Sequence, residues 1–172
     1  MLRPASTGVK PRPSLEWSRD ALPEVAMFKR ILVPIDFSDH SRRPLELALE
    51  LARPVAGRVI LFSVVDDTFP NPDIMSFQLP WADYYRHLRD GAVKILEDLK
   101  AAVGDGEDVE VCVVRGNPAR AIVRFATDEH CDLIIMATHG TRGLQHALLG
   151  SVTDKVIRQV SCPVLVVRLH ST

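Results

Sequence analysis

The chain has only three cysteines among its 172 residues, and no CxxC pair. An odd number of cysteines without paired spacing argues against a disulfide framework and gives no sign of a zinc site. Cys112, Cys131 and Cys162 each lie in or beside an apolar run, where a reduced cysteine behaves as a small hydrophobic residue. We therefore expect a reducing environment and a cytoplasmic protein.

The sequence also lacks an excess of one charge and lacks long hydrophobic runs. Lys plus Arg number 21 and Asp plus Glu 22, so bulk charge gives no support for a nucleic-acid or anionic membrane surface. The apolar runs are far shorter than the roughly 20 residues of a transmembrane helix. With 47% apolar and 25% charged residues, the composition is that of one globular domain. Neither nucleic acid nor a membrane is an expected partner.

Residues 1–26 differ in composition from the rest of the chain. They hold four of the twelve prolines, and their apolar residues show no period. They have no apolar centre like that of a secretory signal, and their acidic residues argue against an organellar transit peptide. We predict a disordered extension over residues 1–26 and one domain over residues 27–172. A translation start at Met27 and a translated, disordered leader both agree with this pattern.

From Met27 onward, short β-branched runs alternate with segments of helical periodicity. The runs predict buried strands at residues 30–35, 58–65, 109–114, 133–137 and 163–168. Strands that alternate with helices of this length predict an α/β fold, a doubly wound parallel sheet with helices on both faces.

Signals at their ends mark the first two helices. With Ser41 as N-cap of the first helix, Pro44 lies in the first turn at little cost; with Ser38, Pro44 would kink the helix. Pro54 and Gly57 end that helix. The second helix is expected to end at Gly104, and its predicted apolar face consists of Trp81, Tyr84, Tyr85, Leu88, Ala92, Ile95, Leu96 and Leu99. Its aromatic start could contact a ligand or partner, although core packing is the commoner use.

The last two helices follow recognisable start signals. Asn117-Pro118 predicts the start of the third helix, and Ser151–Asp154 matches a capping box that opens the fourth. Residues 66–80 show no periodicity, and a loop of this length is usually functional or mobile. Residues 138–150 are expected to form a glycine-bearing connection with a short helix at 144–149.

Glycines after the fourth predicted strand indicate a possible phosphate site. Gly140 and Gly143 supply flexible backbone, and Gly150 with Ser151 opens a helix whose free amides suit phosphate oxygens. Arg142 and His146 could add positive charge. The alternative is that the glycines only turn the chain and Ser151 only caps the helix. The sequence contains neither a P-loop nor a GxGxxG motif.

Two further segments end at the same edge of the predicted sheet, where doubly wound folds bind ligands. Pro34 and Asp36 follow the first strand, and the carboxylate could accept from a ribose hydroxyl, hold a hydrated metal ion, or cap the next helix. The backbone of Val64 could read a base edge, or Val64 could simply end a strand. His139 is more often a solvated residue than a base, and no nucleophile–base pair stands out.

Several of these motifs, in this order and spacing, resemble the universal stress protein family over residues 27–168. The resemblance rests on residues 28–38, 59–61, 116–118, 131–140, 148–153 and 163–167. It implies a five-stranded parallel sheet of order 3-2-1-4-5, in a single domain of the adenine-nucleotide α-hydrolase-like type. One branch of the family binds ATP through a G-x2-G-x9-G-[ST] motif.

The resemblance implies a set of ATP-binding residues. The motif falls on Ala137, Gly140, Gly150 and Ser151, with alanine in place of the first glycine. The adenosine would lie near Pro34, Asp36 and the Val64 backbone, and the phosphates near Gly140, Gly150, Ser151 and Val152. Arg142 and Gly143 are added as candidate contacts, and the cofactor expected is ATP with Mg²⁺.

The resemblance also implies a homodimer through the last strand, which would cover the apolar edge formed by Val164, Leu165, Val166 and Val167. We expect a nucleotide-dependent stress-response or regulatory module with at most slow ATP hydrolysis. Two alternatives remain: an enzyme of the wider adenine-nucleotide α-hydrolase-like group, and a nucleotide-free dimeric interaction protein.

Overall fold

The five strands form one parallel sheet, as predicted. The computed structural model describes residues 28–38, 41–66, 81–103, 108–138 and 150–168. The strands are β1 (Arg30–Pro34), β2 (Arg58–Val65), β3 (Val109–Arg115), β4 (Leu133–Ala137) and β5 (Val164–Val167). Every neighbouring pair is parallel, and the order across the sheet is β3-β2-β1-β4-β5.

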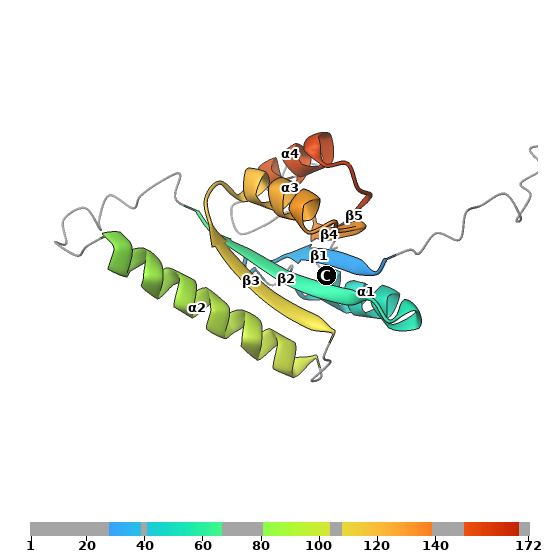
Figure 1. Ribbon diagram of the computed structural model, residues 1–172, viewed down its shortest axis with the longest axis horizontal. Coiled ribbons are helices and arrows are strands. Elements are labelled where there is room, and N and C mark those ends of the chain that lie inside the picture. The colour runs from blue at the N-terminus through green and yellow to red at the C-terminus, as the bar shows by residue number, and fades with distance from the viewer. Residues whose placement is uncertain (1–27, 39–40, 67–80, 104–107, 139–149, 169–172) are drawn as a thin grey trace, which may run out of the picture.

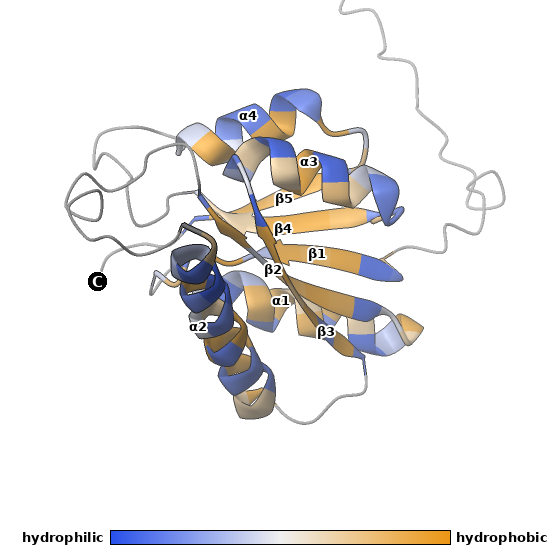
Figure 2. Ribbon diagram, turned by 60° about the vertical axis from the view of Figure 1, so that its left-hand side comes forward, coloured by the Kyte–Doolittle hydropathy of each residue, from blue (hydrophilic) through white to orange (hydrophobic). Residues whose placement is uncertain are grey.

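Helices cover both faces of this sheet, as Figure 1 shows. On one side lie α1 (Arg42–Ala52) and α2 (Trp81–Ala102), and on the other α3 (Pro118–Asp128) and α4 (Ser151–Gln159). Successive side chains of a strand point to opposite faces. In β1, Ile31 and Val33 therefore enter the α1–α2 core, while Leu32 enters the α3–α4 core. Because both faces are covered, the strands are apolar along most of their length (Figure 2).

The strand order reverses at β1. The chain runs outward from β1 to β2 and β3, then returns to place β4 on the other side of β1. The connections that follow β1 and β4 therefore leave in different directions. The carboxyl ends of these two strands are the position at which doubly wound sheets bind ligands.

The start and end of α1 follow one of the two predicted alternatives. Ser41 is the N-cap residue, so Pro44 lies buried in the first turn and no kink is required. The Ser41 hydroxyl does not cap the helix, because it donates instead to Asp36 Oδ1 at 3.0 Å. After Ala52 a 3₁₀ turn, η3 (Arg53–Val55), leads to Gly57, whose N–H donates to the Ala52 carbonyl.

The predicted apolar face of α2 was partly wrong. Ala92 and Leu96 are buried, but the side chains of Leu88 and Ile95 are 40% and 45% exposed. The helix packs against β2 and β3 at one edge of the sheet, so the covered flank is narrower than the apolar stripe. Gly104, the side chain of Trp81, the short helix at 144–149 and residues 1–26 lie outside what the structure describes.

The three cysteines are free thiols. Burial raises the pKa of the Cys131 thiol to about 11, so this side chain stays protonated and acts as an apolar core residue. Within the described residues, no cluster of three or more His, Cys, Asp or Glu side chains could hold a metal ion. None of the helices described there is both long and apolar enough to cross a bilayer.

Gly57 and Gly91 give opposite predictions for the same substitution. A Cβ atom on Gly57 would overlap the Phe28 carbonyl oxygen and lie 3.2 Å from the Lys29 Cα, whereas one on Gly91, within α2, would meet open space. Gly57→Ala should lower the free energy of unfolding by about 1–3 kcal/mol. Gly91→Ala should raise it by about 0.5–1 kcal/mol. Urea unfolding of the two variants measures both values, and equal effects would contradict this packing.

Candidate functional site

The carboxyl edge of the sheet brings together the predicted residues that the structure describes. Pro34 ends β1, Ala137 ends β4 and Val64 is the penultimate residue of β2. Asp36 follows β1 by two residues, and α4 begins at Ser151 after a connection from β4. Four separate parts of the chain therefore converge where the strand order reverses.

Asp36 organises the turn between β1 and α1. Its Oδ1 accepts bonds from the Ser38 N–H at 3.2 Å, the Ser38 hydroxyl at 2.6 Å and the Ser41 hydroxyl at 3.0 Å. Between Asp36 and Ser38, Phe37 adopts a positive φ of 62°, a conformation that a bulky residue rarely takes without support. The exposed carboxylate thus holds the turn in shape rather than capping the amides of α1.

The backbone of Val64 faces the space that β1 leaves when it turns away. The Phe62 carbonyl accepts from the Ile35 N–H at 2.8 Å, the last bond between these two strands. Backbone groups two residues apart on a strand point to the same side, so those of Val64 also point toward β1. In the described part of the chain no hydrogen bond links them to another residue. An N–H and a carbonyl are therefore available side by side to a ligand.

Two hydrogen bonds fix the start of α4 to the end of β4. The Thr153 hydroxyl donates to the Ala137 carbonyl at 3.0 Å, and the Gly150 N–H donates to the Thr138 carbonyl at 2.6 Å. Thr153 is buried, so its hydroxyl has no access to water as an alternative partner. Sequence reasoning missed Thr153, although a hydroxyl residue at the third position of a helix beside an apolar strand is a recognisable signal.

At the start of α4, backbone amides have no acceptor among the described residues. The N-cap residue is Gly150 and no side chain caps the helix, so the predicted capping box with Ser151 as the cap was wrong. The N–H groups of Ser151 and Val152 find no acceptor among the described residues. By contrast, Asn117 Oδ1 accepts from the Arg120 N–H at 3.2 Å and caps α3 as predicted. Free amides at a helix start form an anion-binding site.

Alanine at the first motif position causes no backbone strain. Ala137 lies in β4, and it is not among the described non-glycine residues with positive φ. A glycine is therefore not required there by conformation. Gly140, Arg142 and Gly143, and also His139 and His146, lie outside the described residues, so this structure does not place them.

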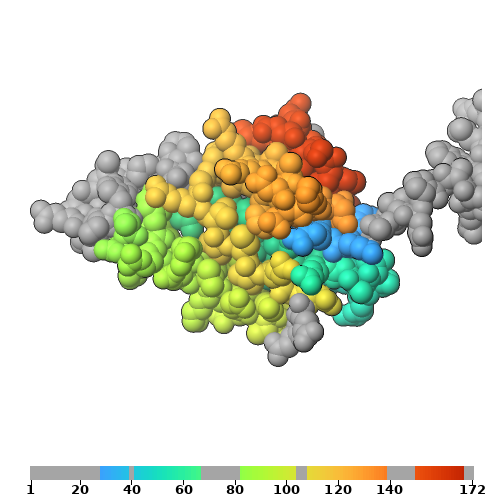
Figure 3. All heavy atoms as spheres, in the orientation of Figure 1, coloured from blue at the N-terminus to red at the C-terminus, as the bar shows by residue number. Residues whose placement is uncertain are grey.

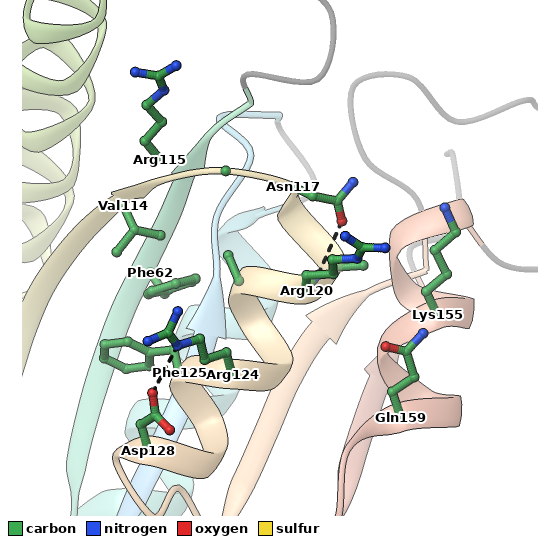
Figure 4. A pocket seen from close by; sticks show the side chains of 13 residues that line it. Phe62, Val114, Arg115, Asn117, Arg120, Arg124, Phe125, Asp128, Lys155 and Gln159 are labelled. Carbon is green, nitrogen blue, oxygen red and sulfur yellow. Dashed lines mark hydrogen bonds and ion pairs between the residues drawn. The ribbon is translucent and has the colours of Figure 1, made fainter.

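A second feature, which sequence reasoning did not find, is a cavity of about 830 Å³ beside α3. Its apolar lining includes Phe62, Val114 and Phe125, and its polar lining includes Arg120 and Lys155 (Figure 4). From outside, atoms of β2 are visible between β3 and α3 on this side of the molecule (Figure 3). None of the predicted site residues that the structure describes lines this cavity.

Comparisons with known proteins agree with this geometry. The model of the universal stress protein family matches residues 27–168. Universal stress protein MJ0577 of Methanocaldococcus jannaschii is 36% identical over 155 residues, covering 83% of this chain and 96% of that protein. Universal stress protein YxiE of Bacillus subtilis is 32% identical over 148 residues, covering 83% of this chain and 100% of that protein.

Solved structures give the same result. The structure of MJ0577 has a TM-score of 0.74 at 35% identity and covers 85% of this chain and 99% of that one. A universal stress protein solved in complex with cAMP has a TM-score of 0.57 at 25% identity, covering 83% of this chain and 98% of that one. The family model spans residues 27–168, well over half of the chain, and relatives exceed 30% identity over almost their full length. The chain belongs to the universal stress protein family.

Proposed function

We propose that this protein binds ATP at the carboxyl edge of its sheet and acts as a dimeric, nucleotide-dependent regulatory module. The observation that carries the proposal is the uncapped start of α4, where the amides of Ser151 and Val152 have no acceptor among the described residues. The Val64 backbone offers a donor and an acceptor at the same edge. A relative in complex with cAMP supports an adenine nucleotide as the ligand class.

In this proposal the two ends of the nucleotide use different parts of the edge. The adenosine lies near Pro34, Asp36 and Val64, where the base meets the backbone groups of β2. The phosphates lie against the amides of Gly150, Ser151 and Val152, whose helix dipole favours negative charge. Ala137, Gly140, Arg142 and Gly143 complete the proposed phosphate site.

Mg²⁺ would reach this site chiefly with the nucleotide. The metal prefers oxygen ligands and is often bound through substrate phosphates and one or two carboxylates. Asp36 and the Ser151 hydroxyl supply oxygen atoms of this kind, while the described residues contain no cluster that could hold the ion alone. When bound, Mg²⁺ would neutralise part of the triphosphate charge.

We propose that the nucleotide works by being bound rather than by being consumed. Fast hydrolysis needs a group that positions or activates the attacking water. The described part of the edge offers backbone amides, hydroxyls and an Asp36 carboxylate that already accepts bonds from Ser38 and Ser41. Any hydrolysis is therefore expected to be slow, and the nucleotide would alter the shape or the partners of the dimer.

The proposed dimer forms through β5. Among the described strands it has one neighbour, β4, so no described strand pairs with its other edge. Leu165 is 37% exposed there, between the half-buried Val164 and Val166. Pairing β5 with the same strand of a second copy would satisfy the open backbone groups and cover the apolar side chains.

Gly150→Arg tests the nucleotide proposal. An arginine side chain at the N-cap of α4 would occupy the space beside the free amides, so MgATP affinity should fall at least about tenfold, or roughly 1.4 kcal/mol. Isothermal titration calorimetry measures the change. Gly91→Arg is the matched control because that glycine is exposed on α2 with open space around it, and it should keep wild-type affinity. A wild-type protein that ignores ATP would favour the nucleotide-free interaction protein instead.

Leu165→Lys tests the dimer. Edge-to-edge pairing of two β5 strands would bring the two lysine side chains together, where their like charges repel and they lose contact with water. The variant should therefore sediment as a monomer where the wild-type protein sediments as a dimer. Ile95→Lys on α2 is the control, since that side chain is similarly exposed but lies on a helix far along the chain from β5. A Leu165→Lys protein that remains dimeric in analytical ultracentrifugation would contradict the β5 interface.

A further inference from the structure

The cavity beside α3 has an apolar floor and a basic wall. The rings of Phe62 and Phe125 pack with their centroids 4.5 Å apart at its base. Asp128 is the acidic side chain among its lining residues, and it already accepts from Arg124 Nε at 3.3 Å. The remaining charged residues among the described lining are positive, so this part of the cavity is complementary to an anion.

Two of these cations, Arg120 of α3 and Lys155 of α4, have no carboxylate partner among the residues that the structure describes. Figure 4 shows the Arg120 guanidinium directed from α3 toward α4, with the Lys155 ammonium beside the start of that helix. Within the described residues neither side chain forms an ion pair, whereas Arg124 pairs with Asp128 and Arg158 with Asp154.

The local sequence explains why these two cations remain unpaired. Residues four positions away on a helix are the natural ion-pair partners. For Arg120 these are Gly116 and Arg124, and for Lys155 they are Ser151 and Gln159. Neither set contains an acid. Both residues are exposed to solvent, and an anion bound between the two helices would be attracted by both charges.

The unpaired cations adjoin the free amides of α4. Lys155 lies one turn after Ser151 on the same face of the helix, and helical side chains lean toward the N-terminus. The Lys155 ammonium therefore points toward the amides of Ser151 and Val152. Arg120 belongs to the first turn of α3, whose start lies at the same carboxyl edge of the sheet.

We propose that Arg120 and Lys155 form an outer anion subsite for the terminal phosphates of a nucleoside polyphosphate. This inference rests on the proposed nucleotide function. A chain of phosphates that starts at the α4 amides extends between α3 and α4, where the two cations meet its end. The outer anion subsite would make the protein prefer tri- and diphosphates over monophosphates, because a monophosphate does not reach it.

The test compares ATP, AMP and inorganic tripolyphosphate as ligands in calorimetry. Arg120→Gln and Lys155→Gln should each weaken ATP and tripolyphosphate binding about tenfold, the loss of one charge-assisted contact, and leave AMP binding unchanged. Arg120→Lys should recover part of the loss. Arg124→Gln is the matched control, since Arg124 lies one turn further along α3 and is already paired with Asp128. Thermal unfolding of each variant verifies that it is folded.

The outcomes separate the two proposals. If the wild-type protein binds both nucleotides and the variants lose ATP and AMP affinity equally, or lose neither, the outer anion subsite is refuted while nucleotide binding stands. If it binds tripolyphosphate through Arg120 and Lys155 but neither nucleotide, the subsite stands as a general polyphosphate site and the nucleotide proposal fails. Absence of binding to all three ligands refutes both.

Discussion

The arrangement of the candidate site depends on one buried hydrogen bond, from the Thr153 hydroxyl to the Ala137 carbonyl. It joins a side chain in the first turn of α4 to the last residue of β4, and so holds the helix start over the carboxyl end of the strand. A single such bond contributes about 1 kcal/mol net to stability, but leaving a buried hydroxyl unpaired would cost more. The position of α4 is therefore tied closely to that of the sheet.

This attachment explains how a helix start can remain uncapped. A side chain at the N-cap usually satisfies one of the free amides, as Asn117 does for α3. At α4 the anchoring is supplied by Thr153 and by the Gly150 N–H, and the amides of Ser151 and Val152 are left without acceptors among the described residues. The fold thus secures the helix without using the groups that suit an anion. The start of α4 lies at the carboxyl edge of the sheet, where the strand order reverses. The Val64 backbone lies at this edge as well.

The strands were predictable because their determinants are local, whereas the order of the strands in the sheet was implied by the resemblance to the universal stress protein family. A strand buried on both faces is largely apolar, and the run over residues 59–65, interrupted by the buried Ser63, makes up all of β2 after Arg58. The apolar stripe of α2 was less informative, since periodicity marks a face but not how much of it a neighbour covers. Leu88 and Ile95 are exposed for that reason.

The features that the sequence did not predict depend on where segments distant in the sequence end in space. The capping-box pattern at Ser151 does not distinguish an N-cap from the first helical residue, and the structure makes Gly150 the cap. On its β1 side the Val64 backbone has no hydrogen-bond partner among the described residues, because β1 turns away after Ile35, which no pattern around Val64 reveals. Arg120 and Lys155 share a cavity because α3 and α4 pack together, although the two residues lie far apart in the sequence.

The most direct test of this account is the change in backbone amide NMR signals when MgATP, and separately AMP, is added to the isotope-labelled protein. We predict that the Val64 amide responds to both ligands, and that the Ser151 and Val152 amides respond more strongly to MgATP. Signals that do not move at these residues, or that move only on α2 at Leu88 and Ile95, would contradict a nucleotide site at the carboxyl edge of the sheet.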